Sequence, residues 1–256
     1  MSTNYSYRPK LAYQQTTIQS IKSSSAAVAS TSFRPFYLRG DISSQAAGSA
    51  TCELGKTKVL CSIYGPRQRK SGGRAEFAGR GAIDVEASFA PYSRRQYTRK
   101  EDLEKESREL SLFLENTLES SVQLHRFPKS VLDVYLIVLE DDGSVYACAA
   151  LCASFALAKS GVEMYDLVSC CTLSISSNGN IELDPNLEEE TNSKALCTVG
   201  TLSTSGKLVC FDVKAEESTP EIINKLLSVG LKACAEKAKV MREQLIFEEQ
   251  EKNQSS

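Results

Sequence analysis

The hydrophobic and polar positions in the first half of the chain predict three strands. Thr57–Tyr64 reads T-K-V-L-C-S-I-Y, the composition of a buried strand, and the turn residues Gly65-Pro66 follow it. Ile83–Phe89 alternates apolar and other residues with the period of two that a half-buried strand requires. Val131–Leu139 is almost continuously aliphatic, so we expect this strand to be covered on both faces.

Apolar spacing and end signals predict three long helices. Residues 101–124 form the first, because their apolar side chains fall on one helical stripe: Leu103, Leu110, Phe113, Leu114, Leu118 and Val122. Val145–Ser160 is rich in Ala and Cys and ends at Gly161, which predicts a helix packed closely against a sheet. The last helix opens with the capping box Ser218-Thr219-Pro220-Glu221 and is expected to end near Phe247.

The second half adds two hairpins, and the order of elements then indicates the fold class. Val168–Ser176 and Ile181–Leu183 are joined by Ser-Asn-Gly-Asn, and residues 194–204 and 207–214 surround Ser205-Gly206. The order hairpin, strand, helix, strand, helix, hairpins, helix predicts an α+β (mixed α/β) fold in one compact domain. A doubly wound parallel sheet is not expected.

Composition divides the chain into a domain and two tails. Residues 1–32 are rich in Ser, Thr, Gln and Ala without apolar periodicity, which is typical of a disordered polar tail. The domain is expected to span residues 33–247, and residues 248–256 to form a polar C-terminal tail. Of the 256 residues, 41% are hydrophobic and 24% are charged, as in ordinary globular domains.

Charge and apolar run lengths exclude some classes of protein. Thirty basic and 32 acidic residues leave a net charge of −2, which excludes the bulk electrostatic binding of histone-like proteins. No apolar run approaches the roughly 18 residues that would span a bilayer, and the N-terminus has no apolar signal segment. We expect a soluble intracellular protein that does not bind membranes.

The scarcity of histidine limits the chemistry available to the chain. With one histidine, His125, a histidine pair or a multi-histidine metal site is excluded. The nine cysteines are scattered through apolar runs, so we interpret them as buried thiols in a reducing compartment. Carboxylates between Glu182 and Glu190 have the chemistry of a magnesium site, but this acidic run is more typical of a solvated loop. We therefore expect no metal and no cofactor.

A basic stretch between Gly65 and Lys100 is the candidate nucleic-acid surface. It contains nine basic and three acidic residues, a local charge of +6. Arginine pairs with two phosphate oxygens at once, and Tyr92 and Tyr97 are placed to stack on bases. An interface with another protein fits the same arginines, and the two roles are compatible. The predicted RNA-binding residues are Arg67, Arg69, Lys70, Arg74, Arg94, Arg95 and Arg99.

A series of short motifs resembles the RNase PH family over about residues 33–247. In chain order the matching residues are Arg34-Pro35, Gly40-Asp41, Ala47-Gly48-Ser49, Gly55-x-Thr57-x-Val59, Tyr64-Gly65-Pro66-Arg67, Ser107-Arg108-Glu109-Leu110 and Asp141-x-Gly143. The resemblance implies a fold related to the second domain of ribosomal protein S5. It also implies six-membered rings around an RNA channel. Active members cleave RNA from the 3′ end with inorganic phosphate, using arginines for phosphate and acidic residues for a divalent metal.

The chain departs from the family pattern where that chemistry is carried. Val145 stands where the family's phosphate-binding arginine aligns, in the loop after the aspartate-glycine turn. Leu112, Asn116 and Glu119 stand where further arginines align on the first long helix, and Asn192-Ser193-Lys194-Ala195 replaces an acidic pair. Because phosphorolysis depends on positioning and charge neutralisation, these losses together predict an inactive member.

The resemblance therefore implies a catalytically inactive RNase PH-like ring subunit of the eukaryotic RNA exosome. The segment Leu183–Glu190 and a short C-terminal helix look most like the Mtr-type subunit. Its expected partners are the other RNase PH-like subunits of a hetero-hexameric ring, S1/KH-type RNA-binding cap subunits and single-stranded RNA. The implied location is the nucleus, nucleolus and cytoplasm. Two alternatives stay open: an active phosphate-dependent 3′-to-5′ exoribonuclease, and a module that binds only protein.

Overall fold

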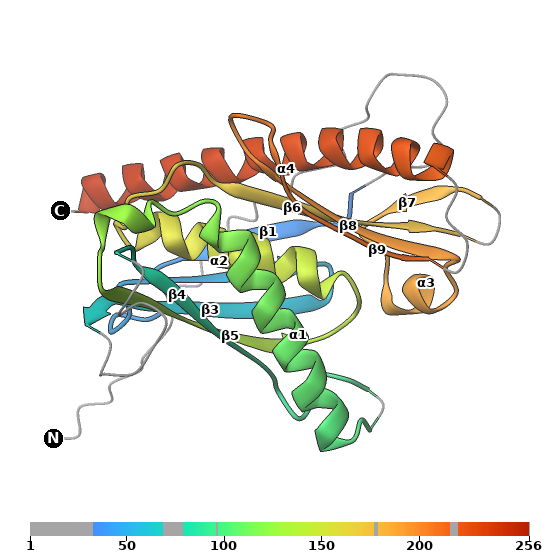
Figure 1. Cartoon of the computed structure of the whole chain (residues 1–256), viewed down its shortest axis with the longest axis horizontal. Coiled ribbons are helices and arrows are strands. Elements are labelled where there is room, and N and C mark those ends of the chain that lie inside the picture. Colours follow the sequence, from blue (N-terminus) through green and yellow to red (C-terminus); the bar gives the residue numbers. More distant parts are fainter. Residues whose placement is uncertain (1–32, 69–78, 96, 177–178, 216–219, 256) are drawn as a thin grey trace, which may run out of the picture.

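A computed structural model describes residues 33–68, 79–95, 97–176, 179–215 and 220–255. They form four layers, in the order sheet, helices, sheet, helix (Figure 1). The first sheet has the strand order β1-β2-β3-β5-β4. Its strands are β1 (Phe36–Gly40), β2 (Gly48–Leu54), β3 (Thr57–Gln68), β4 (Ala82–Phe89) and β5 (Ser130–Glu140).

The first sheet is antiparallel except for β4, which runs parallel to β5. Strand β3 continues past Gly65-Pro66, where a register shift lies between Tyr64 and Arg67, so it is longer than the sequence predicted. Strand β5 is covered on one face only, because Tyr135 and Ile137 are 41% and 40% exposed. The prediction that both of its faces are covered was wrong. Tyr135 and Ile137 leave part of the outer face of this sheet open to solvent.

The second layer holds α1 (Lys100–Glu119) and α2 (Val145–Lys159). Helix α1 contacts β4 and α2, and it ends at Glu119, earlier than predicted; the 3-10 helix η2 (Leu124–Arg126) follows. Helix α2 contacts β2 and β3 of the first sheet and β6 of the second. Twelve of its fifteen residues are buried, which confirms the prediction of close packing against a sheet.

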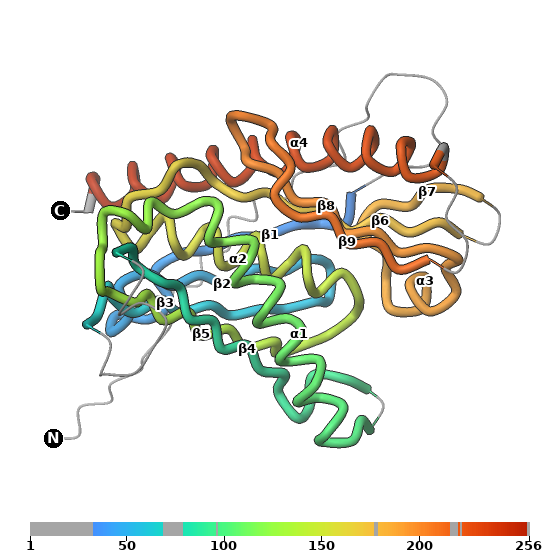
Figure 2. The backbone as a smooth tube through the Cα atoms, viewed as in Figure 1, coloured from blue at the N-terminus to red at the C-terminus, as the bar shows by residue number. Residues whose placement is uncertain are grey.

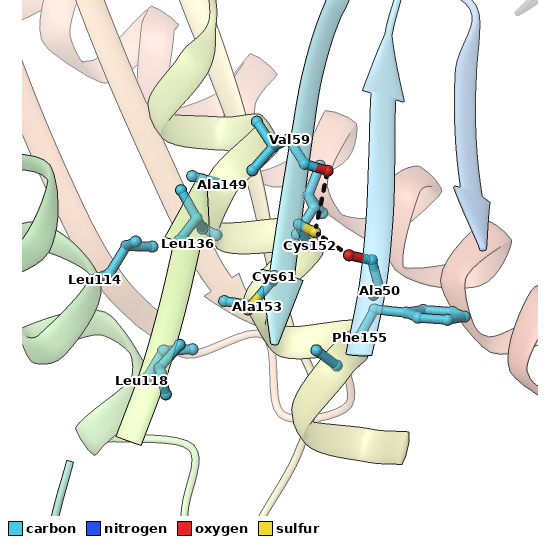
Figure 3. Close-up of a cluster of buried hydrophobic side chains, with 14 of the residues drawn as sticks. Ala50, Val59, Cys61, Leu114, Leu118, Leu136, Ala149, Cys152, Ala153 and Phe155 are labelled. Atoms are coloured by element: carbon cyan, nitrogen blue, oxygen red, sulfur yellow. Dashed lines mark hydrogen bonds between the residues drawn. The ribbon is translucent and has the colours of Figure 1, made fainter. Parts of the chain in front are cut away.

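Small side chains let α2 approach the first sheet closely (Figure 3). A Cβ atom on Gly48 of β2 would lie 2.3 Å from the Ala156 carbonyl oxygen, so this position requires glycine. The Cys152 thiol donates to the Ala50 carbonyl oxygen at 3.3 Å. All nine cysteines are free, and all but Cys210 are buried, which confirms their interpretation as core thiols.

The second sheet is antiparallel and has the strand order β7-β6-β8-β9. Two hairpins form it, β6 with β7 and β8 with β9, and a short helix lies between them. The elements are β6 (Val168–Ile175), β7 (Ile181–Leu183), α3 (Leu187–Thr191), β8 (Ala195–Leu202) and β9 (Leu208–Ala215). This mixture of largely antiparallel sheets and helices confirms the predicted α+β class.

The last helix, α4 (Pro220–Ser255), covers the outer face of the second sheet and reaches β1 with its C-terminal part (Figure 2). It extends beyond the predicted end at Phe247, so residues 248–255 are helical, and the C-terminal helix is long. The extension has contacts: the Gly40 N–H donates to Glu248 Oε1 at 2.9 Å, and Lys159 Nζ lies 2.9 Å from Glu248 Oε2. The domain boundaries at 33 and 247 stay a prediction. No helix in the described ranges is long and apolar enough to cross a membrane.

Candidate functional site

The loop that leads into α2 is held by residues of the family-like motifs. The Thr57 hydroxyl donates to the Gly143 carbonyl oxygen at 2.7 Å and accepts from the Asp142 N–H at 3.1 Å. Gly143 has φ 90°, and a Cβ atom there would lie 2.7 Å from backbone atoms of Asn186 and Leu187. Only glycine fits both the conformation and the space. The Asp141-x-Gly143 motif therefore fixes the start of α2.

Arg34 joins this loop to the segment before α3. Its guanidinium donates to the carbonyl oxygens of Asp142 and Pro185 at 3.2 Å and 3.3 Å, and it pairs with Asp142 Oδ2 at 3.1 Å. Gly55, in the β2–β3 turn with φ 62°, leaves room for that guanidinium, since a Cβ atom would lie 2.6 Å from it. These motif residues are brought together in the structure, and each of them has a structural contact.

The chain's own carboxylate occupies the N-terminus of α2. The Ser144 N–H donates to Glu190 Oε1 at 2.6 Å, and the Ser144 hydroxyl donates to the Pro185 carbonyl oxygen at 2.9 Å. A negative group is stabilised there by the free N–H groups and the helix dipole. Burial and repulsion from Asp141 nevertheless raise the pKa of Glu190, although the Ser144 N–H acts in the opposite direction.

A pocket of about 440 Å³ opens over this end of α2, between α1 and the second sheet. We call it the α2 pocket. Five carboxylates and three cationic groups line it, an excess of two negative charges when all are ionised. The carboxylates belong to Asp102, Glu106, Glu109, Asp141 and Glu190, and the cations to Arg94, Lys105 and Lys214. Val145, the position at which the family resemblance led us to expect a phosphate-binding arginine, also lines it. A second anion in this pocket would be repelled.

Arg94, one of the predicted RNA-binding residues, lies in the wall of the α2 pocket. Its Nε donates to Asp141 Oδ2 at 2.8 Å and its Nη1 to Glu106 Oε1 at 3.2 Å. The guanidinium also lies 5.2 Å from the centre of the Phe89 ring. The side chain is 23% exposed, so Arg94 bridges two elements of the fold instead of projecting into solvent.

Arg95 and Arg99 lie in the connection between β4 and α1, and both are exposed. Tyr92 and Tyr97 of the same connection are 73% and 94% exposed, which leaves their ring faces open. We call these four residues the basic connection. Arginine and tyrosine side chains presented together have the chemistry that binds single-stranded nucleic acid, charge for phosphate and rings for bases.

Arg67 lies away from the basic connection. It pairs across the sheet with Val131 of β5, whereas β4 ends opposite Val138. Seven strand residues separate the two points, about 23 Å along β5. Arg67 lies over the Tyr64 ring at 5.0 Å and pairs with Asp133 at 3.7 Å. The predicted residues Arg69, Lys70 and Arg74 lie outside the described residues. The basic stretch, continuous in sequence, is thus divided in space.

The structure also places Asp184 and the α1 residues Leu112 and Glu119, which the sequence analysis considered as candidate positions. Asp184 is buried and pairs with Lys237 of α4 at 2.6 Å. Sequence reasoning missed Lys237, although a lysine among the apolar positions of the last helix was the available signal. On α1, Leu112 is 59% exposed and Glu119 pairs with Arg80 at 2.9 Å. Within the described ranges no group of three His, Cys, Asp or Glu side chains is arranged to hold a metal ion.

Comparison with known proteins gives consistent matches. A family model described as "3′ exoribonuclease family, domain 1" matches residues 32–163. The chain is similar to the mouse (Mus musculus) "Exosome complex component MTR3", with 36% identity over 228 residues and 84% of each chain covered. It is 30% identical over 210 residues to the Arabidopsis thaliana "Exosome complex component RRP41-like", covering 82% of this chain and 79% of the relative.

Solved structures agree. The crystal structure of rice (Oryza sativa) Rrp46 matches with a TM-score of 0.70 and 25% identity, covering 82% of this chain and 93% of that one. A chain of the Archaeoglobus fulgidus exosome with RNA bound to the active site has the same fold, with a TM-score of 0.69, 22% identity, and coverage of 83% and 89%. With the family model covering half of the sequence and relatives matching most of it, the chain belongs to the RNase PH family of 3′ exoribonucleases.

Proposed function

We propose that this chain is a non-catalytic, structural and RNA-binding subunit of an exosome core ring. In this role it supports 3′-to-5′ RNA processing and degradation, including rRNA maturation and mRNA turnover, by nucleases carried on other subunits. The similarity to MTR3 exosome components over 84% of the chain supports the assignment to the ring. The lack of catalysis rests on the site itself.

The hydrogen bond from the Ser144 N–H to Glu190 carries the proposal. In active family members the loop before this helix presents an arginine and N–H groups to phosphate. Here Val145 supplies no charge, and Glu190 already fills the position of an anion. The surrounding excess of carboxylates repels a second anion. Losing both the positioning and the neutralisation of phosphate removes what phosphorolysis requires.

The partners follow from the same proposal. The other RNase PH-like subunits of a hetero-hexameric ring, and S1/KH-type cap subunits, bind to the outer surfaces of this chain. Single-stranded RNA binds to the basic connection and to Arg67, together with Arg69, Lys70 and Arg74. Arg94, from the same predicted set, supports the connection through its bridge to Asp141 and Glu106. The compartments are those of the exosome: nucleus, nucleolus and cytoplasm.

A phosphorolysis assay tests the lack of catalysis. The purified chain is incubated with end-labelled poly(A), magnesium and inorganic phosphate, beside an active RNase PH as the positive control. We expect no nucleoside diphosphate above background. Release of nucleoside diphosphates that is abolished by Glu190→Gln or Asp184→Asn would contradict the proposal. The chain would then be an active phosphate-dependent 3′-to-5′ exoribonuclease.

Assembly is tested separately. Co-expression with the other RNase PH-like chains of the same organism is expected to give a complex with one copy of this chain per ring. Native mass spectrometry measures the stoichiometry. A chain that stays monomeric beside an assembled ring would contradict the structural role, whatever its activity.

A further inference from the structure

The structure protects three of its four sheet edges. Strand β1 has five residues, and its Gly40 N–H donates to Glu248 Oε1 of α4 at 2.9 Å. On β4 the Ala87 N–H donates to the Ser111 hydroxyl of α1 at 2.9 Å. Strand β7 has only three residues. Edge strands that are short or covered in this way offer few free backbone groups to another chain.

Strand β9 is the exception. It lies at the end of the second sheet, pairs only with β8 and has eight residues (Figure 1). Outside that pairing its backbone N–H and C=O groups have no hydrogen-bond partner among the described residues. None of its eight residues is buried, whereas six of the eight residues of β8 are. A long open edge of this kind is a template for pairing with another strand.

The side chains of β9 do little to prevent such pairing. Leu208 and Phe211 are apolar and are 47% and 37% exposed. Asp212 and Lys214 are exposed, and because side chains alternate along a strand, these two lie on the same face. The strand thus has one charge of each sign and no proline, so neither like charges nor a missing N–H group protects its edge.

The charge pattern of β9 fits a second copy of the same strand. When two copies run antiparallel with Val213 opposite Val213, Asp212 of each copy lies opposite Lys214 of the other. Two pairs of opposite charge then face each other, and such cross-strand pairs stabilise a sheet. In the same register Phe211 lies opposite Ala215, whose small side chain leaves room for the ring.

The other registers lack this match. Asp212 opposite Asp212, or Lys214 opposite Lys214, brings like charges together, which destabilises a pair of strands. Phe211 opposite Phe211 places Asp212 beside Cys210 and leaves both charges without a partner. A shift by a single residue turns the apolar face of one strand towards the polar face of the other. The charges therefore select the register centred on Val213.

We propose that two copies of this chain pair through β9, antiparallel and with Val213 at the two-fold axis, so that their second sheets form one continuous sheet. One strand pair makes a small interface, so we expect a reversible dimer with a dissociation constant in the micromolar range. The proposal concerns the chain on its own, where the edge is open, and it does not depend on the proposed ring.

Sedimentation velocity of the purified full-length chain, from about 1 to about 100 µM, tests the dimerisation. We expect a dimer to replace the monomer across this range, with no larger species, because a symmetric interface closes at two copies. Hydrogen exchange followed by mass spectrometry locates the contact. The β9 amides should exchange more slowly at the high concentration, whereas those of β7, at the other edge of the same sheet, should not change.

Charge reversal tests the register. Asp212→Lys places two lysines opposite each other and Lys214→Asp places two aspartates opposite each other, so each variant is expected to weaken the dimer about tenfold. A mixture of the two variants should dimerise as well as the natural chain, because each reversed side chain meets the opposite charge. Lys207→Asp is the matched control, since Lys207 is exposed in the connection from β8 to β9, outside the paired residues.

Three results would overturn the proposal. The first is a chain that stays monomeric at about 100 µM with a native circular dichroism spectrum. The second is dimerisation that both charge reversals leave unchanged, which would place the contact elsewhere. The third is a mixture of the two variants that dimerises no better than each variant alone.

One outcome separates this proposal from the proposed function. If the chain is monomeric alone and its β9 amides are protected only in an assembled ring, a strand of another ring subunit occupies the edge. The dimer would then be contradicted while the ring subunit stands. A chain that dimerises through β9 but joins no ring would give the opposite result.

Discussion

A charged side chain of the protein lies at each end of α2, but the two side chains have different surroundings. At the C-terminal end, Lys159 lies in the last turn of α2, and its Nζ lies 2.9 Å from Glu248 and 3.2 Å from Glu249. At the N-terminal end, Glu190 accepts the Ser144 N–H at 2.6 Å. Each end thus has a charge of the sign that the helix dipole favours, and both charges come from the protein itself.

The ends differ in what surrounds that charge. The Lys159 side chain is 2% exposed and enclosed by carboxylates of α4 and by Asp41, so this end attaches the last helix. Glu190 faces a pocket with more carboxylates than cations. The comparison shows that the chain's own carboxylate can occupy a helix end while a pocket remains beside it. The N-terminal end of α2 thus faces an excess of carboxylates, whereas the C-terminal end has a structural contact.

The largest expected effect is at the C-terminal end. Lys159→Met leaves Glu248, which is only 12% exposed, without the cation that lies 2.9 Å from it, whereas Asp41 and Glu249 keep their contacts with Lys252. We expect the free energy of unfolding at pH 7 to fall by about 3 kcal/mol, the size typical of breaking a buried ion pair. Equilibrium unfolding in urea measures it.

Lys252 provides the matched control. It pairs with Asp41 at 2.8 Å from an exposed position, with 52% of its side chain accessible. Lys252→Met should cost less than about 1 kcal/mol, because exposed ion pairs contribute little. If Lys159→Met and Lys252→Met lower the free energy of unfolding equally, the buried Lys159 does not hold α4 more strongly than the exposed Lys252 does.

The next effect is at the wall of the α2 pocket. Arg94→Gln removes the bridge between Asp141 and Glu106, and the Asp141 side chain is 4% exposed. We expect a loss of about 2 kcal/mol in urea unfolding, less than a full buried-pair loss because the Gly143 N–H still donates to Asp141. A stability equal to that of the natural chain would contradict the structural role of Arg94.

A third prediction separates the pocket from the basic connection in RNA binding. Arg95→Gln with Arg99→Gln removes two exposed guanidinium groups. The slope of log affinity against log salt for a poly(A) oligonucleotide should become shallower by about 1.4, since each phosphate contact on a single strand contributes about 0.7. Fluorescence anisotropy across a salt series measures it.

The control for that experiment is Lys105→Gln, which changes a cation of the α2 pocket. We expect its salt slope to match that of the natural chain. If Lys105→Gln changes the slope and the arginine pair does not, RNA binds at the pocket. If neither changes it, the arginines serve protein contacts alone, and charge reversal at Arg95 and Arg99 should disturb ring assembly.

The smallest effect is a pH dependence at Glu190. Burial and Asp141 raise its pKa, while the Ser144 N–H, Arg34 and Lys214 oppose the shift. The folded state therefore binds this proton more tightly than the unfolded state. The resulting stability is present below the ordinary pKa of glutamate, near pH 4, and is lost as the pH rises through the raised value.

Glu190→Gln cannot ionise, so its stability should fall less between pH 4 and pH 7 than that of the natural chain. Urea unfolding at intervals across this range gives the two curves. A variant whose curve falls more steeply would mean that the carboxylate is stabilised in its charged form, and that the end of α2 still has room for negative charge.

Local patterns predicted most of the elements. The aliphatic run at β5 and the small residues of α2 were sufficient for those two elements, because strand and helix periodicity are properties of neighbouring residues. The exposure of Tyr135 and Ile137 depends on which layers the chain adds elsewhere, and a single run of residues does not contain that information. Similarly, α4 extends to Ser255, and Glu248 in this extension contacts Gly40 and Lys159, which are distant in the sequence.

The site was predicted in part for the same reason. The sequence singled out Val145 as a position expected to hold an arginine in the family, and Val145 lines the pocket. Glu190, 46 residues after Ser144, read as part of a solvated acidic loop, and its place at the start of α2 follows from the tertiary fold. In the sequence nothing distinguishes Arg94 from its exposed neighbours. Its contacts with Asp141 and Glu106 exist only in the folded chain.

The most direct test of the central claim is the binding of inorganic phosphate to the full-length chain, followed by phosphorus NMR. We predict no saturable broadening or shift of the phosphate signal for the natural chain, because Glu190 occupies the N-terminus of α2 within an excess of carboxylates. Saturable binding that Val145→Glu abolishes would contradict the account, since phosphate would then be held at the very end of the helix that we describe as closed.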